Sequence, residues 1–169
     1  DLQGAQTSTA ACERMSSVSH TSPKLGIRSQ PLDWLELRGS WAEGFAIAPD
    51  TAKYELGAGS VSPNVFRQIE LGITLTWRDL GLDFASYRID SSDEIGRNPA
   101  GDYENFGETR RQGVEVAGYW YLTDSLDVSL AWATAQSEIR KHRDASLEGN
   151  RVTGVPSHTT TAQLNWRPL

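Results

Sequence analysis

The sequence predicts an all-β fold: an antiparallel up-and-down meander of about seven strands that forms a fragment of a transmembrane β-barrel. Residues 68–77 alternate without a break between polar and apolar side chains, the period of a strand with two different faces. The connections between successive strands alternate between short and long. The apolar rows of five strands contain no charged residue. Together these features are typical of a barrel wall with lipid on one side.

The clearest hairpin runs over residues 67–89. Its first strand carries five apolar side chains on one face: Ile69, Leu71, Ile73, Leu75 and Trp77. A tight polar break at Arg78 and Asp79 separates it from a second strand that begins at Leu80. Each arm has about ten residues, the length that crosses a bilayer as a tilted β-strand.

Five further stretches show a similar pattern before and after this hairpin. We expect these strands at residues 24–30, 34–42, 110–122, 126–133 and 159–166. Short turns, each containing an aspartate, are expected at 31–33, 78–79 and 123–125, and long polar connections at 45–65, 90–109 and 137–156. Outer-membrane barrels have short turns on the periplasmic side and long loops outside.

Composition narrows the class of protein. No run of 18 apolar residues exists, so no membrane-spanning helix is expected. The net charge of −6 and the lack of a basic stripe argue against nucleic acid as a partner. Cys12 is the single cysteine and cannot form an internal disulfide. Residues 1–21 are Ser- and Thr-rich without periodicity, and we expect a disordered or loop lead-in before a barrel segment at 22–169.

The charge-free rows also fit a second fold. An Arg or Lys facing lipid at mid-depth costs about 2–4 kcal/mol, so a lipid-facing row excludes charge. The core of a soluble antiparallel β-sandwich excludes it as well. Aromatic residues near the predicted strand ends favour the membrane, because Trp and Tyr gather at membrane interfaces. They are Trp34, Trp77, Tyr87, Tyr121 and Trp166.

Short motifs in order along residues 22–168 resemble the TonB-dependent outer-membrane receptors. Residues 22–26 resemble a strand opening of that family, and residues 31–35 its Pro-x-Asp-Trp-Leu turn. Further similar motifs are Ser-x-x-x-Gly-Phe at 40–45, Glu-x-Gly at 70–72, Asn-x-Gly with Gly-x-Glu at 105–107 and 113–115, and Gly-x-x with Pro-x-His at 149–151 and 156–158. The chain lacks the Arg that often follows the Gly-Phe pair.

The resemblance implies active uptake of iron–siderophore complexes or other scarce nutrients across the bacterial outer membrane. It implies a 22-stranded barrel filled by an N-terminal plug and energised through TonB. The implied partners are outer-membrane lipid and lipopolysaccharide, a ferric-siderophore-type ligand, and TonB acting through the plug. We expect this chain to be part of a longer precursor that supplies the plug, the TonB box and the remaining strands.

Five side chains in the predicted outer loops are candidate ligand contacts: Tyr103, Phe106, Arg140, His142 and Arg143. Aromatic rings stack on flat ligands, and a basic cluster binds anionic ligands or lipopolysaccharide phosphates. Ordinary loop packing and loop charge are the competing interpretations. His20 carries no prediction, and we expect a structural role for His158. Gly113 indicates a bulge or a close approach at the barrel rim.

No metal, cofactor or catalytic site is expected. The acidic residues of the predicted second long connection lack the spacing of an EF-hand, so we expect a solvated outer loop. These residues are Asp90, Asp93, Glu94, Asp102, Glu104 and Glu108. No nucleophile elbow or phosphate loop is present. A receptor segment is therefore the leading hypothesis; the alternatives are a soluble β-sandwich binding module and a porin-type barrel.

Overall fold

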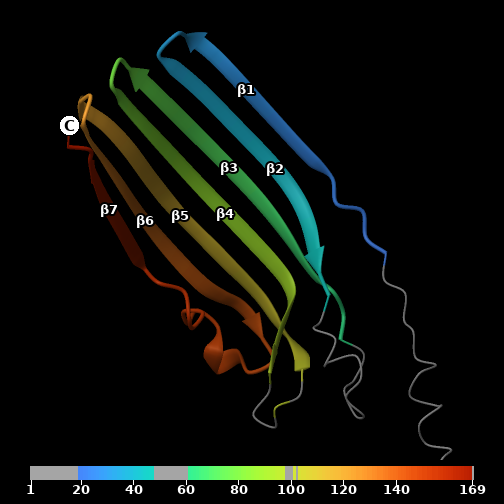
Figure 1. Cartoon of the computed structure of the whole chain (residues 1–169). Helices are drawn as coiled ribbons and strands as arrows, with labels where there is room; N and C mark the ends of the chain where they lie inside the picture. Colours follow the sequence, from blue (N-terminus) through green and yellow to red (C-terminus); the bar gives the residue numbers. More distant parts are fainter. Residues whose placement is uncertain (1–18, 48–60, 98–100, 102, 169) are drawn as a thin grey trace, which may run out of the picture.

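The computed structural model describes residues 19–47, 61–97, 101 and 103–168, and the strands among them form one antiparallel sheet. Its strands lie side by side in chain order, from β1 at one edge to β7 at the other (Figure 1). The strands are β1 (Lys24–Leu32), β2 (Leu35–Ala46), β3 (Asn64–Trp77), β4 (Leu80–Arg97), β5 (Tyr103–Thr123), β6 (Leu126–His142) and β7 (His158–Trp166). The predicted seven-stranded meander is confirmed.

The register keeps the faces of neighbouring strands aligned. Leu37, Ile73, Phe84, Val116 and Trp132 pair in succession across five strands. Since side chains alternate along each strand, this row lies on one face and its neighbours lie on the other. We call the face with the Ile73 row outward, and the face with the polar rows inward.

The outward face is not covered by any described residue. The exposed fraction is 64% for Leu71, 65% for Leu164 and 72% for Trp77. All seven strands belong to the same sheet, so no opposing layer packs on this row in the described part of the chain. A β-sandwich buries its apolar rows between two sheets, and the structure therefore disagrees with that alternative.

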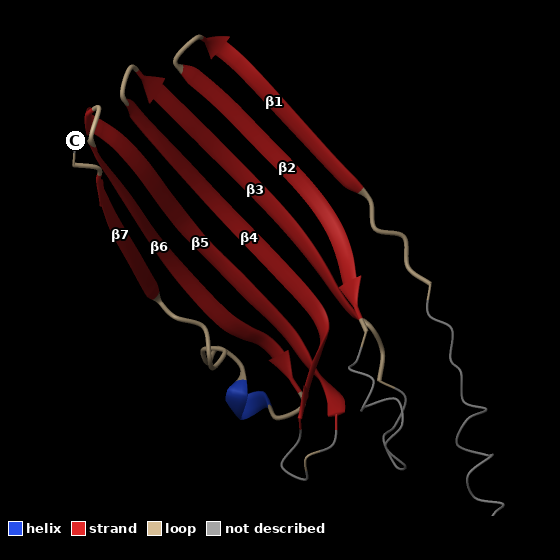
Figure 2. Cartoon of the chain, in the orientation of Figure 1, coloured by secondary structure: helices blue, strands red, loops and turns tan. Residues whose placement is uncertain are grey.

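The three short turns lie at one end of the sheet, as predicted (Figure 1). They centre on Asp33–Trp34, Arg78–Asp79 and Asp124–Ser125. The longer connections leave from the other end. The connection between β6 and β7 contains a single 3-10 turn, η1 (Ala145–Leu147), drawn in blue in Figure 2. Among the residues that the structure describes, no helix has the length and apolarity needed to cross a membrane.

The prediction of a long connection at residues 90–109 is wrong, because most of these residues belong to strands. β4 continues to Arg97 and β5 starts at Tyr103, so the acidic residues Asp90, Asp93, Glu94, Glu104 and Glu108 lie in strands. Asp102 lies outside the described residues. Backbone pairing continues beyond the apolar rows, where polar and charged residues occupy most positions and hydrophobic alternation no longer marks a strand.

Cross-strand ion pairs accompany this polar extension. Arg110 Nε lies 2.6 Å from an Asp90 carboxylate oxygen, and Arg111 Nη2 lies 2.5 Å from Glu94 Oε1. Register shifts near Glu94 bend the hairpin, with Asp93 at a φ of 53°. Opposite charges across a ladder support pairing where apolar contacts are few.

The other two predicted connections are also shorter than expected. β2 extends to Ala46 and β3 starts at Asn64, while residues 48–60 between them lie outside the described part. β6 extends to His142, so the third connection is 143–157. Of the predicted lead-in, residues 1–18 lie outside the described part. His20 lies against β2, with Nε2 3.1 Å from Glu43 Oε1 and its ring 5.3 Å from that of Phe45.

Candidate functional site

The inward face carries a polar network that spans three strands. Arg38 on β2 donates two hydrogen bonds of 2.7 Å to the carboxylate of Asp83 on β4. Thr74 on the intervening β3 donates a 2.7 Å hydrogen bond to Asp83 and accepts one of 2.9 Å from Arg38. Glu70 lies further away, 3.9 Å from Arg38 Nε. The network places fixed charge on the face opposite the apolar rows.

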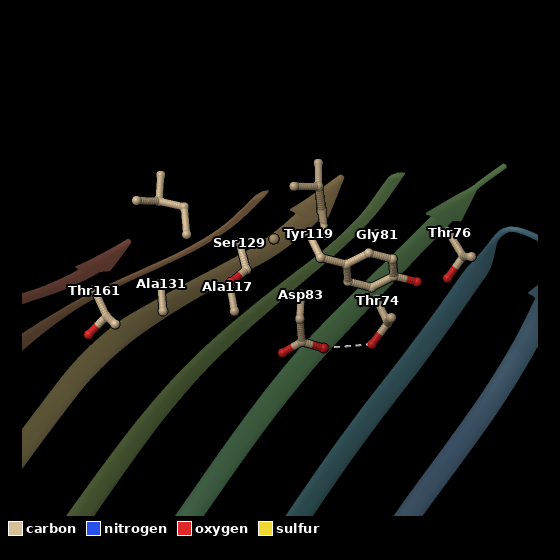
Figure 3. A pocket seen from close by; sticks show the side chains of 12 residues that line it. Thr74, Thr76, Gly81, Asp83, Ala117, Tyr119, Ser129, Ala131 and Thr161 are labelled. Carbon is tan, nitrogen blue, oxygen red and sulfur yellow. Dashed lines mark hydrogen bonds between the residues drawn. The ribbon is translucent and has the colours of Figure 1, made fainter. Parts of the chain in front are cut away.

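Next to this network the inward face is hollowed toward the short-turn end. Figure 3 shows the hollow, with Asp83 and Thr74 on one side and Ala131 and Thr161 on the other. Its volume is about 290 Å³. The ring of Tyr119 extends sideways over Gly81 instead of standing away from the sheet (Figure 3). The hollow is small and mainly apolar in its lining, to which Thr74, Asp83 and Tyr119 add polar groups.

Glycines under side chains of neighbouring strands recur on this face. The predicted close approach at Gly113 is confirmed: a Cβ there would lie 2.8 Å from the Tyr87 hydroxyl and 2.1 Å from the Thr134 carbonyl oxygen. Gly113 pairs in register with Tyr87 and Ala135 without a bulge. A tyrosine lies along the wall in this way because the glycine offers no side chain.

At the long-loop end, Phe106 on β5 and His142 on β6 come together. Their ring centroids are 5.7 Å apart at an interplanar angle of 42°. Phe106 also lies over Gly96, where a Cβ would be 2.8 Å from its ring carbons. His142 Nδ1 accepts a 3.0 Å hydrogen bond from the backbone N–H of Asp144. Two of the predicted ligand contacts therefore form one aromatic surface.

Tyr103 is the first residue of β5, and Arg143 directly follows the end of β6. The guanidinium of Arg97 lies 4.6 Å from the ring centroid of Tyr103 and donates a 3.1 Å hydrogen bond to its hydroxyl. Arg143 Nη1 donates to Glu104 Oε2 at 3.1 Å. Tyr103 is thus paired with a cation, and Arg143 with a carboxylate.

Asn105 fastens three segments beside this surface. Its amide group donates to the carbonyl oxygens of Ser62, at 2.9 Å, and Asp93, at 2.6 Å. Its side-chain oxygen accepts a 2.7 Å hydrogen bond from the N–H of Ser62. The residue preceding Phe106 therefore ties the start of β3 and the bent β4 to β5.

The connection after β6 is closed by local hydrogen bonds. The Asp144 carboxylate caps η1 and accepts a 3.0 Å hydrogen bond from the N–H of Ser146. Hydrogen bonds from Ser146 lower the pKa of Asp144, because they stabilise the ionised carboxylate. The carboxylate thereby stays charged beside His142 at neutral pH.

A register shift divides the basic run at residues 140–143. Thr109 pairs with Ile139 and Glu108 with Lys141, so Arg140 is an extra residue on β6. Such a bulge re-aims the side chains around it. Arg140 and Lys141 both point outward, and each pairs with a neighbouring carboxylate. The pairs are Arg140–Glu138 at 2.9 Å and Lys141–Glu108 at 2.7 Å.

The two outward cations line a hollow of about 220 Å³ between β4, β5 and β6. Its lining residues are Asp90, Ser91, Glu108, Thr109, Arg110, Arg140 and Lys141. Arg140 was a predicted ligand contact together with His142, and the bulge places it in this separate hollow. Sequence reasoning missed Arg110 as part of this group, because the bulge that places Arg140 and Lys141 beside it has no sequence signature.

The Arg38–Asp83 network was missed for a different reason. Arg38 reaches Asp83 only because of the register in which β2 pairs with β3. A long connection joins these two strands, so no turn rule predicts that register from the sequence. The one sequence feature that indicated the network was Gly72, a glycine in an otherwise polar row, which leaves room for a side chain from a neighbouring strand. Within the described residues, no three side chains of His, Cys, Asp or Glu are placed to hold a metal ion.

Comparison with known proteins decides between the remaining barrel alternatives. The family model described as TonB dependent receptor-like, beta-barrel matches residues 3–169. This chain belongs to the TonB-dependent receptor family. Its relatives are bacterial outer-membrane transport receptors, and this outer-membrane location is shared by the chain. A porin-type barrel is thereby set aside.

Individual TonB-dependent receptors resemble the chain at low identity. The metal-pseudopaline receptor CntO of Pseudomonas aeruginosa is 23% identical over 163 residues, 94% of this chain and 21% of the relative. The ferric yersiniabactin uptake receptor FyuA from Yersinia pestis matches with a TM-score of 0.68 at 20% identity, over 85% of this chain and 22% of that chain. The copper transporter OprC has a TM-score of 0.67 at 14% identity, over 87% and 24%.

The chain thus spans about a fifth of the length of the curated relatives it matches. The structural likeness concerns the fold, since every identity quoted is below 25%. The three relatives are named for different cargoes, a metal–pseudopaline complex, ferric yersiniabactin and copper. Proteins with this barrel fold are therefore named for different substrates.

Proposed function

We propose that this chain forms part of the wall of a receptor that imports a scarce metal as a chelate, such as an iron–siderophore complex. One observation carries the proposal: a single pleated sheet of the receptor family presents bare apolar rows on one face and a charged network on the other. Lipid solvates the first face, and the aqueous interior of the barrel lies against the second.

The energy for this import comes from TonB, acting through an N-terminal plug domain of the same receptor. Import against a gradient needs an energy source, and family membership supports this one. The inward Arg38–Asp83 network supports a role in lining the passage, since its charges are paired and held in place.

The ligand contacts proposed for the outer end are Tyr103, Phe106, His142 and Arg143. The Phe106–His142 pair offers a flat aromatic surface, and Arg143 adds a cation that attracts anionic chelates. Names of the relatives, which include siderophore and metal receptors, support this substrate class.

Uptake of radiolabelled iron by cells that express the complete receptor tests the proposal. The probes are ferric citrate and a ferric catecholate, offered with and without functional TonB. We expect uptake of at least one probe, and its loss without TonB. Uptake that persists without TonB would contradict an energised receptor.

The contact residues are tested separately in the same cells. Replacing Phe106→Ala together with His142→Ala should weaken binding of the transported chelate by about tenfold, because an aromatic surface is lost. Tyr121→Ala, at the short-turn end of β5, is the matched control and should leave binding unchanged. If the double variant binds normally, the ligand surface lies elsewhere while the receptor assignment stands.

A further inference from the structure

We propose that Glu94 on β4 is a positioning residue for the outer aromatic surface: its carboxylate fixes the bulges that aim Phe106 at His142. This role rests on the ligand surface proposed above and adds the residue that sets its geometry. Glu94 acts through Phe106 and contacts no ligand itself. Its removal should therefore misplace the Phe106 ring and leave the wall below intact.

Phe106 is the extra residue of a bulge on β5. Glu94 pairs with Gly107, whereas the next residue on β4, Ile95, pairs with Asn105. Phe106, between these two partners, is therefore an extra residue on β5. A second register shift, with an extra residue on β4, directly precedes Glu94. Since a bulge re-aims the side chains beside it, the geometry of the Glu94–Gly107 pair decides the direction of the Phe106 ring.

The backbone around this pair adopts unusual conformations. Asp93, which precedes Glu94, has a φ of 53°, and Gly107 has a φ of 147°. A Cβ on Gly107 would lie 1.9 Å from the carbonyl oxygen of Lys141, so β5 and β6 approach closely beside His142, the partner of Gly107. Positive φ values of non-glycine residues are costly and persist only where the surroundings hold them. The bend therefore needs a fastening close to Glu94.

The carboxylate of Glu94 supplies this fastening. Arg111 donates to both of its oxygens, from Nη2 to Oε1 at 2.5 Å and from Nη1 to Oε2 at 3.2 Å. The hydroxyl of Thr109 donates to Oε2, and Arg111 Nη1 donates to the hydroxyl oxygen of Thr109 at 3.0 Å. Thr109 and Arg111 both lie on β5, where its pairing with β4 is regular. Three side chains thus join the irregular pair to the regular ladder.

Low exposure strengthens this fastening. Thr109 is 1% exposed, and the side chains of Glu94 and Arg111 are 14% and 26% exposed. Bidentate, charge-assisted hydrogen bonds are among the strong ones, and they are stronger where little water competes. The Arg143–Glu104 pair at the same end has side chains that are 73% and 30% exposed, and water screens such a pair. Glu94 is therefore the better anchor for the bend.

The position of the Phe106 ring is tested without any ligand. In the complete receptor in detergent, with isotope-labelled histidine rings, the ring resonance of His142 reports the aromatic ring 5.7 Å away. Phe106→Ala should shift this resonance, and Glu94→Ala should shift it in the same direction by a comparable amount. Spectra are recorded at about pH 8, where a free imidazole is uncharged. Glu43→Ala is the matched control and should leave the resonance in place, since Glu43 is 15% exposed and pairs with Arg67 at 2.6 Å on β2 and β3.

Uptake kinetics in the same variants separate positioning from general destabilisation. For ferric citrate or a ferric catecholate, Phe106→Ala should raise KM by about fivefold, the effect of losing one aromatic contact. Glu94→Ala should raise KM by the same factor and leave maximal uptake at saturation unchanged. Combining the two should raise KM no further, because Glu94 acts through Phe106. A purely structural role would lower maximal uptake and add to the effect of Phe106→Ala.

An exchange of charges supplies the rescue. Glu94→Arg should raise KM as Glu94→Ala does, and adding Arg111→Glu should restore most of the native affinity, because the pair forms again. The positioning role is overturned if Glu94→Ala leaves the His142 resonance in place, if Glu43→Ala shifts it as much, or if the KM effects of Glu94→Ala and Phe106→Ala multiply. A native KM in Phe106→Ala, with the His142 resonance still moved by Glu94→Ala, supports the positioning role and puts the ligand surface elsewhere.

Discussion

The guanidinium of Arg38 reaches Asp83 across an intervening strand. The two residues lie on β2 and β4, and two parallel hydrogen bonds of 2.7 Å join them over β3. The crossing passes over Gly72, which pairs in register with Arg38. A Cβ on Gly72 would lie 2.4 Å from the guanidinium carbon and 2.8 Å from Cγ of Arg38. Glycine at this position is therefore what allows the pair to form.

Gly72→Val should displace Arg38 and break its pair with Asp83. We expect a loss of about 1 kcal/mol in the free energy of unfolding, because water screens the side chains, which are 29% and 41% exposed. Urea unfolding of the complete receptor in detergent measures this loss. Gly39→Ala on β2 is the control, since its Cβ meets its nearest atom at 3.4 Å. Equal losses in both variants would show that the effect is not specific to the pair.

Gly81→Val should push the Tyr119 ring off the wall. A Cβ on Gly81 would lie 2.3 Å from Cε1 of that ring. We expect destabilisation of about 1–3 kcal/mol from overpacking. Adding Tyr119→Ala should recover most of it, because the clash disappears with the ring. A double-mutant cycle on thermal unfolding measures the coupling; strictly additive losses would contradict the contact.

Asn105→Ala should release the start of β3 from the bent hairpin. The variant removes the hydrogen bonds to Ser62 and Asp93, so the N–H of Ser62 loses its acceptor. Hydrogen exchange at Ser62 should become faster by about tenfold or more. Asn150→Ala, which removes one 3.3 Å bond to Ser146, is the control and should leave Ser62 protected. Unchanged exchange at Ser62 in Asn105→Ala would count against the fastening role.

The connection after β6 should loosen in acid. The pKa of Asp144 is lowered in the folded chain by hydrogen bonds from Ser146. A lowered carboxyl pKa contributes stability that is present above the unfolded value, near about 4, and is lost as pH falls through the folded value. The amide resonance of Ser146 should therefore shift below about pH 4. Asp144→Asn should remove this shift; a shift that remains would assign the titration to another group.

Much of the wall was predictable because its residues obey local rules. The two-residue turn at Arg78 and Asp79 and the alternation from Ile69 to Trp77 set one hairpin, its register and its two faces. The ends of the strands were not predictable. Around Asp90 and Arg110 polar and charged residues occupy most positions, so pairing continues without the hydrophobic alternation that marks a strand.

The candidate sites were only partly predictable. Phe106 and His142 were identified from their chemistry, and the structure brings them together across β5 and β6. The grouping of Arg140 with Lys141 and Arg110 depends on a bulge, and that of Arg38 with Asp83 depends on the register around Gly72. Both are choices of strand pairing that involve residues distant in sequence.

The sequence by itself determined that this chain forms two-faced strands joined by short turns, because side-chain alternation and turn chemistry are local properties. Only the tertiary structure decided which side chains meet across those strands and how far the strands extend. Cross-strand neighbours are set by register and by single extra residues such as Arg140, and a shift of one residue exchanges the two faces.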